Sequence, residues 1–150
     1  MKKYQLVSPL SEIVDQAVYE KWLARKARAH VKRDRERGND SATVAEYKVE
    51  IHRAVIESDG LDAYTLEKLD WSLLSKYDNE QSKLHGRNYK KLFAMLPSVD
   101  HVDDGLGKAN FKICSWQTND AKNDLAYSEF VELCKKVVRV ATNKPIKRDC

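Results

Sequence analysis

Residues 96 to 124 read LPSVDHVDDGLGKANFKICSWQTNDAKND, and this stretch decides how the rest of the chain is organised. It begins with apolar residues followed by Asp100 and His101, and it then passes through a glycine-containing turn. A β-prone segment follows at 110–116, ahead of a polar helix start. We therefore predict a two-stranded antiparallel hairpin over roughly 96–116 that leads into a helix, an arrangement that brings an acid, a base and amides to one edge.

The spacing of these polar residues resembles the ββα-metal core of HNH nucleases. That family has Asp-His at the end of its first strand, Asn at the start of the second, and His or Asn at the helix start. In this chain Asp100-His101 and Asn110 stand at the first two places, and Asn119 follows Asn110 by the nine residues that the family pattern requires. The resemblance covers the hairpin and the helix start, and it extends to Ser128 at most.

The resemblance implies a division of labour for phosphodiester hydrolysis. His101 would be the general base, because imidazole titrates near neutral pH. Asp100 and Asn119 would be the metal ligands, and two hard oxygen donors favour Mg²⁺ or Mn²⁺. Asn110 would orient the imidazole or tie the hairpin loop by hydrogen bonds to the backbone.

Two further features of the motif concern the phosphate and zinc. Lys122 and Asn123 lie about one helical turn beyond Asn119, where the family often places a phosphate-contacting side chain. The paired cysteines of many family members are absent, so we expect no structural zinc.

The chain before the motif is predicted to be helical and basic. Ser8 and Pro9 predict a helix start, and apolar residues then recur at helical spacing until Gly38 and Asn39 end the helix. The second half of this helix carries a run of basic residues, and such a run is either a solvated helix face or a phosphate-binding arm. The motif downstream favours the arm, and the basic residues expected to contact DNA are Arg25, Arg28, Lys32 and Arg35.

Three more helices follow from hydrophobic periodicity and capping residues. One is predicted from Asp40-Ser41 to Asp59-Gly60, and a second from Asp78 to Phe93, with a hook or hairpin over 61–71 between them. The last begins at Ser128 and is predicted to be a core helix, because its apolar face is nearly continuous. That face is made of Phe130, Leu133, Cys134, Val137, Val138 and Ala141.

Length and composition predict one soluble α+β domain that is mostly helical. The chain has 150 residues, of which 42% are hydrophobic and 33% charged, and its net charge of +4 is compatible with an anionic partner. Within this single domain, 1–95 would be the helical, basic, DNA-contacting part. The ββα-metal core and C-terminal helix would span 96–141, and 142–150 would be a tail.

The cysteines and the hydropathy predict a cytoplasmic protein. Three cysteines with wide spacing and no C-x-x-C pair favour reduced thiols over a disulfide framework, with Cys114 and Cys134 as core residues. The N-terminus does not have the apolar run of a signal peptide, and no stretch reaches the length of a membrane span.

Three functions are compatible with these patterns. The first is a divalent-metal-dependent HNH-type DNA endonuclease, a hydrolase acting on duplex or structured DNA, for which cutting both strands with one site per chain would favour a homodimer. The second is a non-catalytic nucleic-acid-binding module that keeps the HNH-like fold. The third is a protein-interaction domain in which the basic helix binds an acidic partner.

Overall fold

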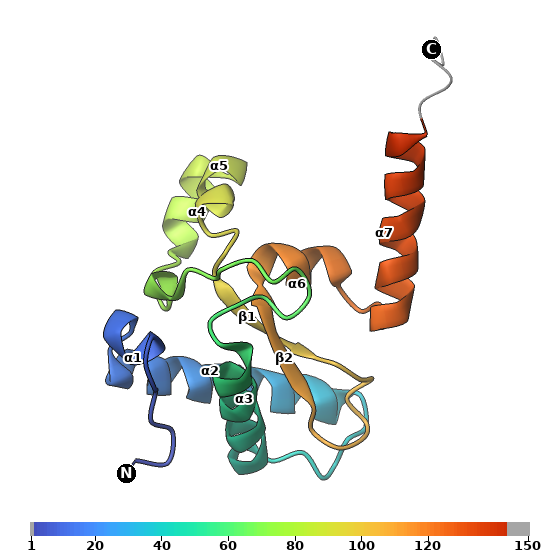
Figure 1. Cartoon of the computed structure of the whole chain (residues 1–150). Coiled ribbons are helices and arrows are strands. Elements are labelled where there is room, and N and C mark those ends of the chain that lie inside the picture. Colours follow the sequence, from blue (N-terminus) through green and yellow to red (C-terminus); the bar gives the residue numbers. More distant parts are fainter. Residues whose placement is uncertain (1, 144–150) are drawn as a thin grey trace.

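Two antiparallel strands lie at the centre of the computed structural model, which describes residues 2–143 (Figure 1). β1 is Pro97–His101 and β2 is Phe111–Ser115, and their register pairs Val99 with Ile113 and His101 with Phe111. The predicted α+β domain with an antiparallel hairpin is therefore confirmed. The helices are α1 (Leu10–Ile13), α2 (Gln16–Glu36), α3 (Val44–Ser58), the 3-10 helix η1 (Trp71–Leu73), α4 (Asn79–His85), α5 (Arg87–Leu92), α6 (Trp116–Lys122) and α7 (Tyr127–Thr142).

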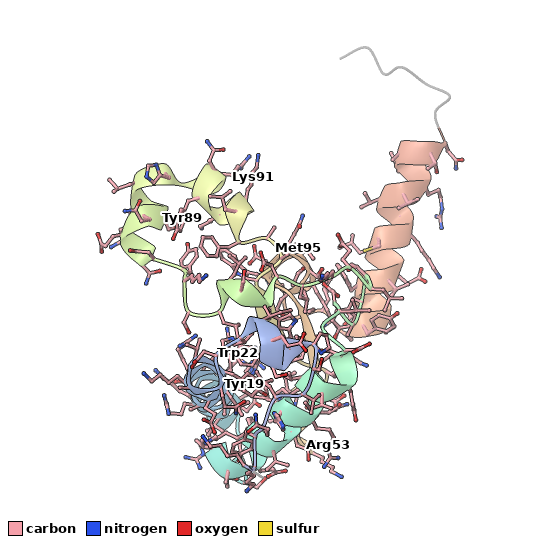
Figure 2. All side chains as sticks on the ribbon, turned by 60° about the vertical axis from the view of Figure 1, so that its left-hand side comes forward. Tyr19, Trp22, Arg53, Tyr89, Lys91 and Met95 are labelled. Atoms are coloured by element: carbon pink, nitrogen blue, oxygen red, sulfur yellow. The ribbon has the colours of Figure 1, made fainter. Side chains whose placement is uncertain are left out.

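The hydrophobic core forms where α2 and α3 pack together and α3 packs against β2. Apolar side chains recur on one face of each helix, so both helices bury a stripe against the hairpin. Figure 2 shows Tyr19 and Trp22 of α2 within this packed body and Arg53 at the outer edge of α3. Full burial of a large apolar side chain contributes about 1.5–3 kcal/mol, so these stripes supply much of the stability.

The single helix predicted from Ser8 to Gly38 is wrong near its start. The chain leaves the helical conformation at Val14, whose φ of −116° and ψ of 129° are extended. Asp15 then begins α2, since its carboxylate accepts hydrogen bonds from the amides of Ala17 and Val18 at 2.9 and 3.2 Å. An aspartate at this position satisfies two free amides, and this cap competes with continuation of the first helix.

The two middle helices also differ from the prediction at their ends. Thr43, not Asp40 or Ser41, caps α3 by accepting from the amide of Glu46. Asp78 caps the next helix as predicted, but that helix is divided into α4 and α5 at Gly86. Gly86 has φ 56° and ψ −130°, a conformation that ends the helical hydrogen bonding at this point.

α6 begins earlier than the predicted start at 118–120. Ser115, the last residue of β2, accepts a hydrogen bond from the amide of Thr118 at 2.9 Å and so caps the helix. Asn119 is consequently the fourth residue of α6 and not its cap. The strand therefore passes directly into the helix, which fixes α6 against the hairpin.

The prediction that the last helix belongs to the core is wrong. α7 has the expected amphipathic sequence, but none of its residues is buried, and Figure 1 shows it extending away from the body. Cys134 is exposed accordingly, whereas Cys114 on β2 is buried as predicted. Periodicity establishes that one face of a helix is apolar, but it does not identify what covers that face.

The ends of the chain and the membrane prediction complete the description. Of the predicted tail over 142–150, Thr142 is the last residue of α7, and residues 144–150 lie outside the described residues. Within residues 2–143, the helices lack the length and apolar character that crossing a lipid bilayer requires.

One buried histidine makes the stability of this fold depend on pH. His30 on α2 donates from Nε2 to the carbonyl of Val99 at 3.1 Å, and burial lowers its pKa from 6.5 to about 3. Between about pH 3 and pH 6.5, His30 therefore binds a proton in the unfolded chain but not in the folded chain. The free energy of unfolding should fall as the pH drops from about 6.5 towards 3, by up to about 1.4 kcal/mol per pH unit.

We predict that His30→Gln, which keeps a donor for Val99, reduces this dependence. Urea unfolding at pH 7 and pH 5 measures the two free energies for each variant. His85→Gln, at an exposed position on α4, is the control and should retain the wild-type slope. An equal slope in His30→Gln and wild type would show that His30 does not couple protonation to unfolding.

Candidate functional site

The end of β1 presents Asp100 and His101 to opposite sides of the hairpin. Successive side chains of a strand point to opposite faces, and here one face meets α2 and α3 while the other meets α6. Both residues are buried, at 6% and 4% exposure. Each is therefore held by its own set of partners.

His101 is held by Asp34, a residue of the basic helix α2. Its Nδ1 lies 2.7 Å from Oδ2 of Asp34, and because a carboxylate only accepts, Nδ1 carries the proton. Nε2 is then the atom with the free lone pair. It is buried and has no hydrogen-bond partner among residues 2–143.

Asp34 is fully buried and is satisfied from several elements. Besides His101, the hydroxyl of Tyr47 on α3 donates to its Oδ2 at 2.6 Å, and Arg33 Nε lies 3.4 Å from its Oδ1. Burial, and then the hydrogen bond to Asp34, raise the pKa of the Tyr47 phenol well above its usual range. The phenol therefore remains a donor, and the carboxylate keeps its charge-assisted contacts.

Gly105 allows the hairpin loop to close over this carboxylate. A Cβ atom at Gly105 would lie 2.4 Å from Oδ1 of Asp34, and the residue has a φ of +83°. The loop is fixed there because Asn39 donates to the carbonyl of Gly105 at 2.7 Å. The glycine-rich turn of the sequence thus serves the close approach of backbone to a buried acid.

On the other side of β1, Asp100 is paired with Lys122 of α6. The ammonium lies 3.1 Å from Oδ2 of Asp100 and donates to the carbonyl of Leu125 at 2.7 Å. The hydroxyl of Tyr64 donates to the same oxygen, and burial followed by this contact raises the pKa of Tyr64. Lys122, predicted to contact phosphate, is 2% exposed and neutralises the predicted metal ligand instead.

The second predicted ligand lies near Asp100 without touching it. Asn119 donates from Nδ2 to the hydroxyl of Ser98 at 3.2 Å, and Ser98 shares a strand face with Asp100. Among the described residues, no hydrogen bond reaches Oδ1 of Asn119 or Oδ1 of Asp100. The cavity at the strand end is lined by Asp100 but not by Asn119, so the structure does not bring the two predicted ligands to one cavity.

A cavity of about 670 Å³ connects the two sides at the strand end. Asp100, His101, Lys122 and Asn123 line it, together with residues from the end of α2 and the start of α7. Its charged lining residues are Arg33, Arg37, Lys122, Asp100, Asp103, Asp104, Asp124 and Glu129. The five carboxylates outnumber the three cationic groups, and two of them, Asp100 and Asp124, are paired with Lys122 and Arg37.

The donor set fits Mg²⁺ or Mn²⁺ better than a softer metal. Carboxylate and amide oxygens with room for water suit these hard ions. Across residues 2–143, no group of three or more His, Cys, Asp or Glu side chains is arranged to hold a metal.

The basic residues that α2 contributes to the cavity differ from those predicted. Arg33 and Arg37 line it, and the latter pairs with Asp124 at 3.2 Å. None of the four α2 residues that were predicted to contact DNA lines the cavity. Arg35 donates twice to the carbonyl of Ala42, Arg25 donates to Ser75, and Arg28 and Lys32 are exposed elsewhere on α2.

Asn110 does not hold the imidazole in this structure. Its side chain is exposed, and its carbonyl accepts from the amide of Val102 at 2.9 Å. Asp34 takes the orienting position at Nδ1. Asp34 could have been found from the sequence, because it continues the buried stripe of Tyr19, Leu23, Ala27 and His30 or Val31, where an unpaired acid is costly.

Comparison with protein-family models, with curated proteins and with solved structures gives no match for this chain. The site is therefore interpreted from its own geometry and chemistry.

We predict that Gly105→Ala destabilises the protein more than the same change at other glycines. The new methyl group meets Asp34 and requires an unfavourable φ, so the loss should be about 2–4 kcal/mol. Gly86→Ala shares the positive φ but meets nothing within 4 Å, and Gly107→Ala meets nothing either, so these are the matched controls.

Urea unfolding of the three variants gives the comparison. Equal losses for Gly105→Ala and Gly86→Ala would mean that backbone conformation, and not contact with Asp34, sets the requirement for glycine.

Proposed function

We propose that this protein is a divalent-metal-dependent endonuclease of the HNH type, which hydrolyses phosphodiester bonds in DNA with His101 as the general base. The proposal joins the residue pattern of the hairpin to the chemistry of the cavity at its end. The observation that carries it is the Asp34–His101 pair, of which His101 lines the cavity together with Asp100 and two arginines.

Asp34 prepares the imidazole for proton abstraction. By accepting from Nδ1–H it fixes the tautomer in which Nε2 is basic, and its charge stabilises the imidazolium that forms when a proton is taken from water. Because Nε2 is buried, proton abstraction requires a movement of the protein that admits a water to this nitrogen.

The chain's oxygen donors would hold the metal. Asp100 would supply a charged oxygen and Asn119 an amide oxygen from α6, while Asn123, which lines the cavity just beyond α6, would contact the phosphate as predicted. When bound, a divalent ion would neutralise charge on the phosphate and lower the pKa of a water bound to it. Lys122 stabilises the charge of the Asp100 carboxylate through an ion pair.

Arg33 and Arg37 would bind the DNA backbone. Both guanidinium groups belong to α2 and line the cavity, and Arg33 is 39% and Arg37 40% exposed at the side chain. A guanidinium matches the geometry of phosphate oxygens and contacts any sequence. The expected substrate is therefore nucleic acid recognised through its backbone.

The second candidate is a nucleic-acid-binding module that does not cut. Two observations favour it, namely the burial of Nε2 of His101 and the ammonium of Lys122 on the Asp100 carboxylate. Incubation of the purified protein with supercoiled plasmid and Mg²⁺, Mn²⁺ or EDTA separates the candidates. Metal-dependent nicking supports the nuclease, whereas salt-sensitive binding without nicking supports the module.

We predict that His101→Ala slows cleavage by about 10²–10⁴, the usual contribution of a general base, and leaves DNA binding intact. Asp34→Asn keeps the shape of the side chain but removes its charge, so cleavage should slow and the pH–rate profile should move. Single-turnover cleavage and circular dichroism of each variant are the measurements.

His85→Ala removes an exposed histidine on α4, outside the cavity lining, and this variant should cleave at the wild-type rate. Wild-type cleavage by His101→Ala would remove His101 as the base. A slower rate in Asp34→Asn with an unmoved pH profile would limit Asp34 to a structural role.

For DNA binding, we predict that Arg33→Gln with Arg37→Gln weakens affinity for all sequences. The slope of log affinity against log salt should decrease by about 0.9 for each phosphate that the variant no longer binds. The matched pair Arg28→Gln with Lys32→Gln changes the same amount of charge away from the cavity. If the second pair weakens binding more than the first, the outer face of α2 and not the cavity holds the DNA.

A further inference from the structure

α7 carries a row of exposed apolar side chains. Those exposed by 46% or more are Tyr127, Leu133, Val137, Val138 and Val140. Phe130 and Val131, in the first half of α7, are half-buried. Scattered exposed apolar residues are ordinary, but Leu133, Val137 and Val140 recur at the i, i+4 and i+7 spacing of one helix side and, with Val138 beside them, mark an interaction surface.

No described element packs along this face. Figure 1 shows α7 leaving the body after α6, and its first residue stays attached because Tyr127 stacks on Tyr64 at 5.6 Å between ring centroids. A groove of about 860 Å³ separates the helix from the segment 64–67 and from α6. Phe130, Cys134 and Val138 face this groove, so apolar surface borders it along most of α7.

The charges of α7 are divided between its two halves. The first half carries Glu129 and Glu132, and the second half carries Lys135, Lys136 and Arg139. Within the helix, Lys135 lies 3.2 Å from Glu132 where the halves meet. The helix is therefore acidic at the end attached to the body and basic at the free end.

We propose that α7 pairs antiparallel with α7 of a second copy of this chain, covering the apolar row in a two-fold symmetric dimer. This inference goes beyond the proposed function and does not rest on it. An antiparallel partner brings the acidic half of each helix beside the basic half of the other, whereas a parallel partner opposes like charges. The two helix dipoles are also opposed favourably.

The attachment of α7 favours the same arrangement. Each helix is joined to its body at the Tyr127 end, so antiparallel pairing places the two bodies at opposite ends of the helix pair. A two-fold interface uses the same patch on both copies, so the patch must be complementary to itself. A helix whose two halves have opposite charge meets this requirement.

Sedimentation of the full chain over a range of concentrations tests the association. We expect a concentration-dependent dimer, and Val137→Glu and Val138→Glu should each raise its dissociation constant about tenfold or more, because each places a charge in an apolar interface. Ser128→Glu, outside the apolar row, is the control and should dimerise like the wild type. A monomer at every concentration, or an undiminished dimer in both glutamate variants, overturns the proposal.

Cross-linking tests the orientation. In a Cys134→Ser, Cys150→Ser background, one chain carries Tyr127→Cys and another carries Val140→Cys, and a mild oxidant such as diamide joins thiols that lie close together. Positions 127 and 140 are about 20 Å apart along a helix. Cross-links between the two different chains support antiparallel pairing, and cross-links formed only between identical chains overturn it.

Discussion

The buried carboxylate of Asp34 is the constraint on which the rest of the structure depends. Asp34 belongs to α2 and is fully buried. Its carboxylate connects this helix to α3 through the hydrogen bond with Tyr47 and to β1 through the hydrogen bond with His101. Leaving a buried charge without its partners costs several kcal/mol, so these elements stabilise one another only together. The loop at Gly105 completes the enclosure and excludes water from the carboxylate.

The strand period separates Asp100 and His101 at the end of β1. It directs His101 into the helical core and Asp100 towards α6, where Lys122 and Tyr64 hold it. The two residues therefore have independent surroundings although they are adjacent in sequence. Both belong to the lining of the cavity at the strand end.

α7 links the surface chemistry of the protein to this cavity. Glu129 in its first turn lines the cavity, while its side chain also accepts a hydrogen bond from the amide of Ala126. The apolar row begins in the same turn at Tyr127. A partner that covers α7 consequently acts on an element that contributes a carboxylate to the site, and the two surfaces are not independent.

The sequence by itself determined the hairpin, the burial of Cys114 and the apolar stripes of α2 and α3, because these depend on local spacing and β propensity. It also placed Asp100 and His101 at the strand end. Tertiary structure alone decided that Asp34 and not Asn110 holds the imidazole, that Lys122 is buried on Asp100, and that α7 stands outside the core. Local periodicity states which face of an element is apolar or charged, but residues distant in the chain decide what that face meets.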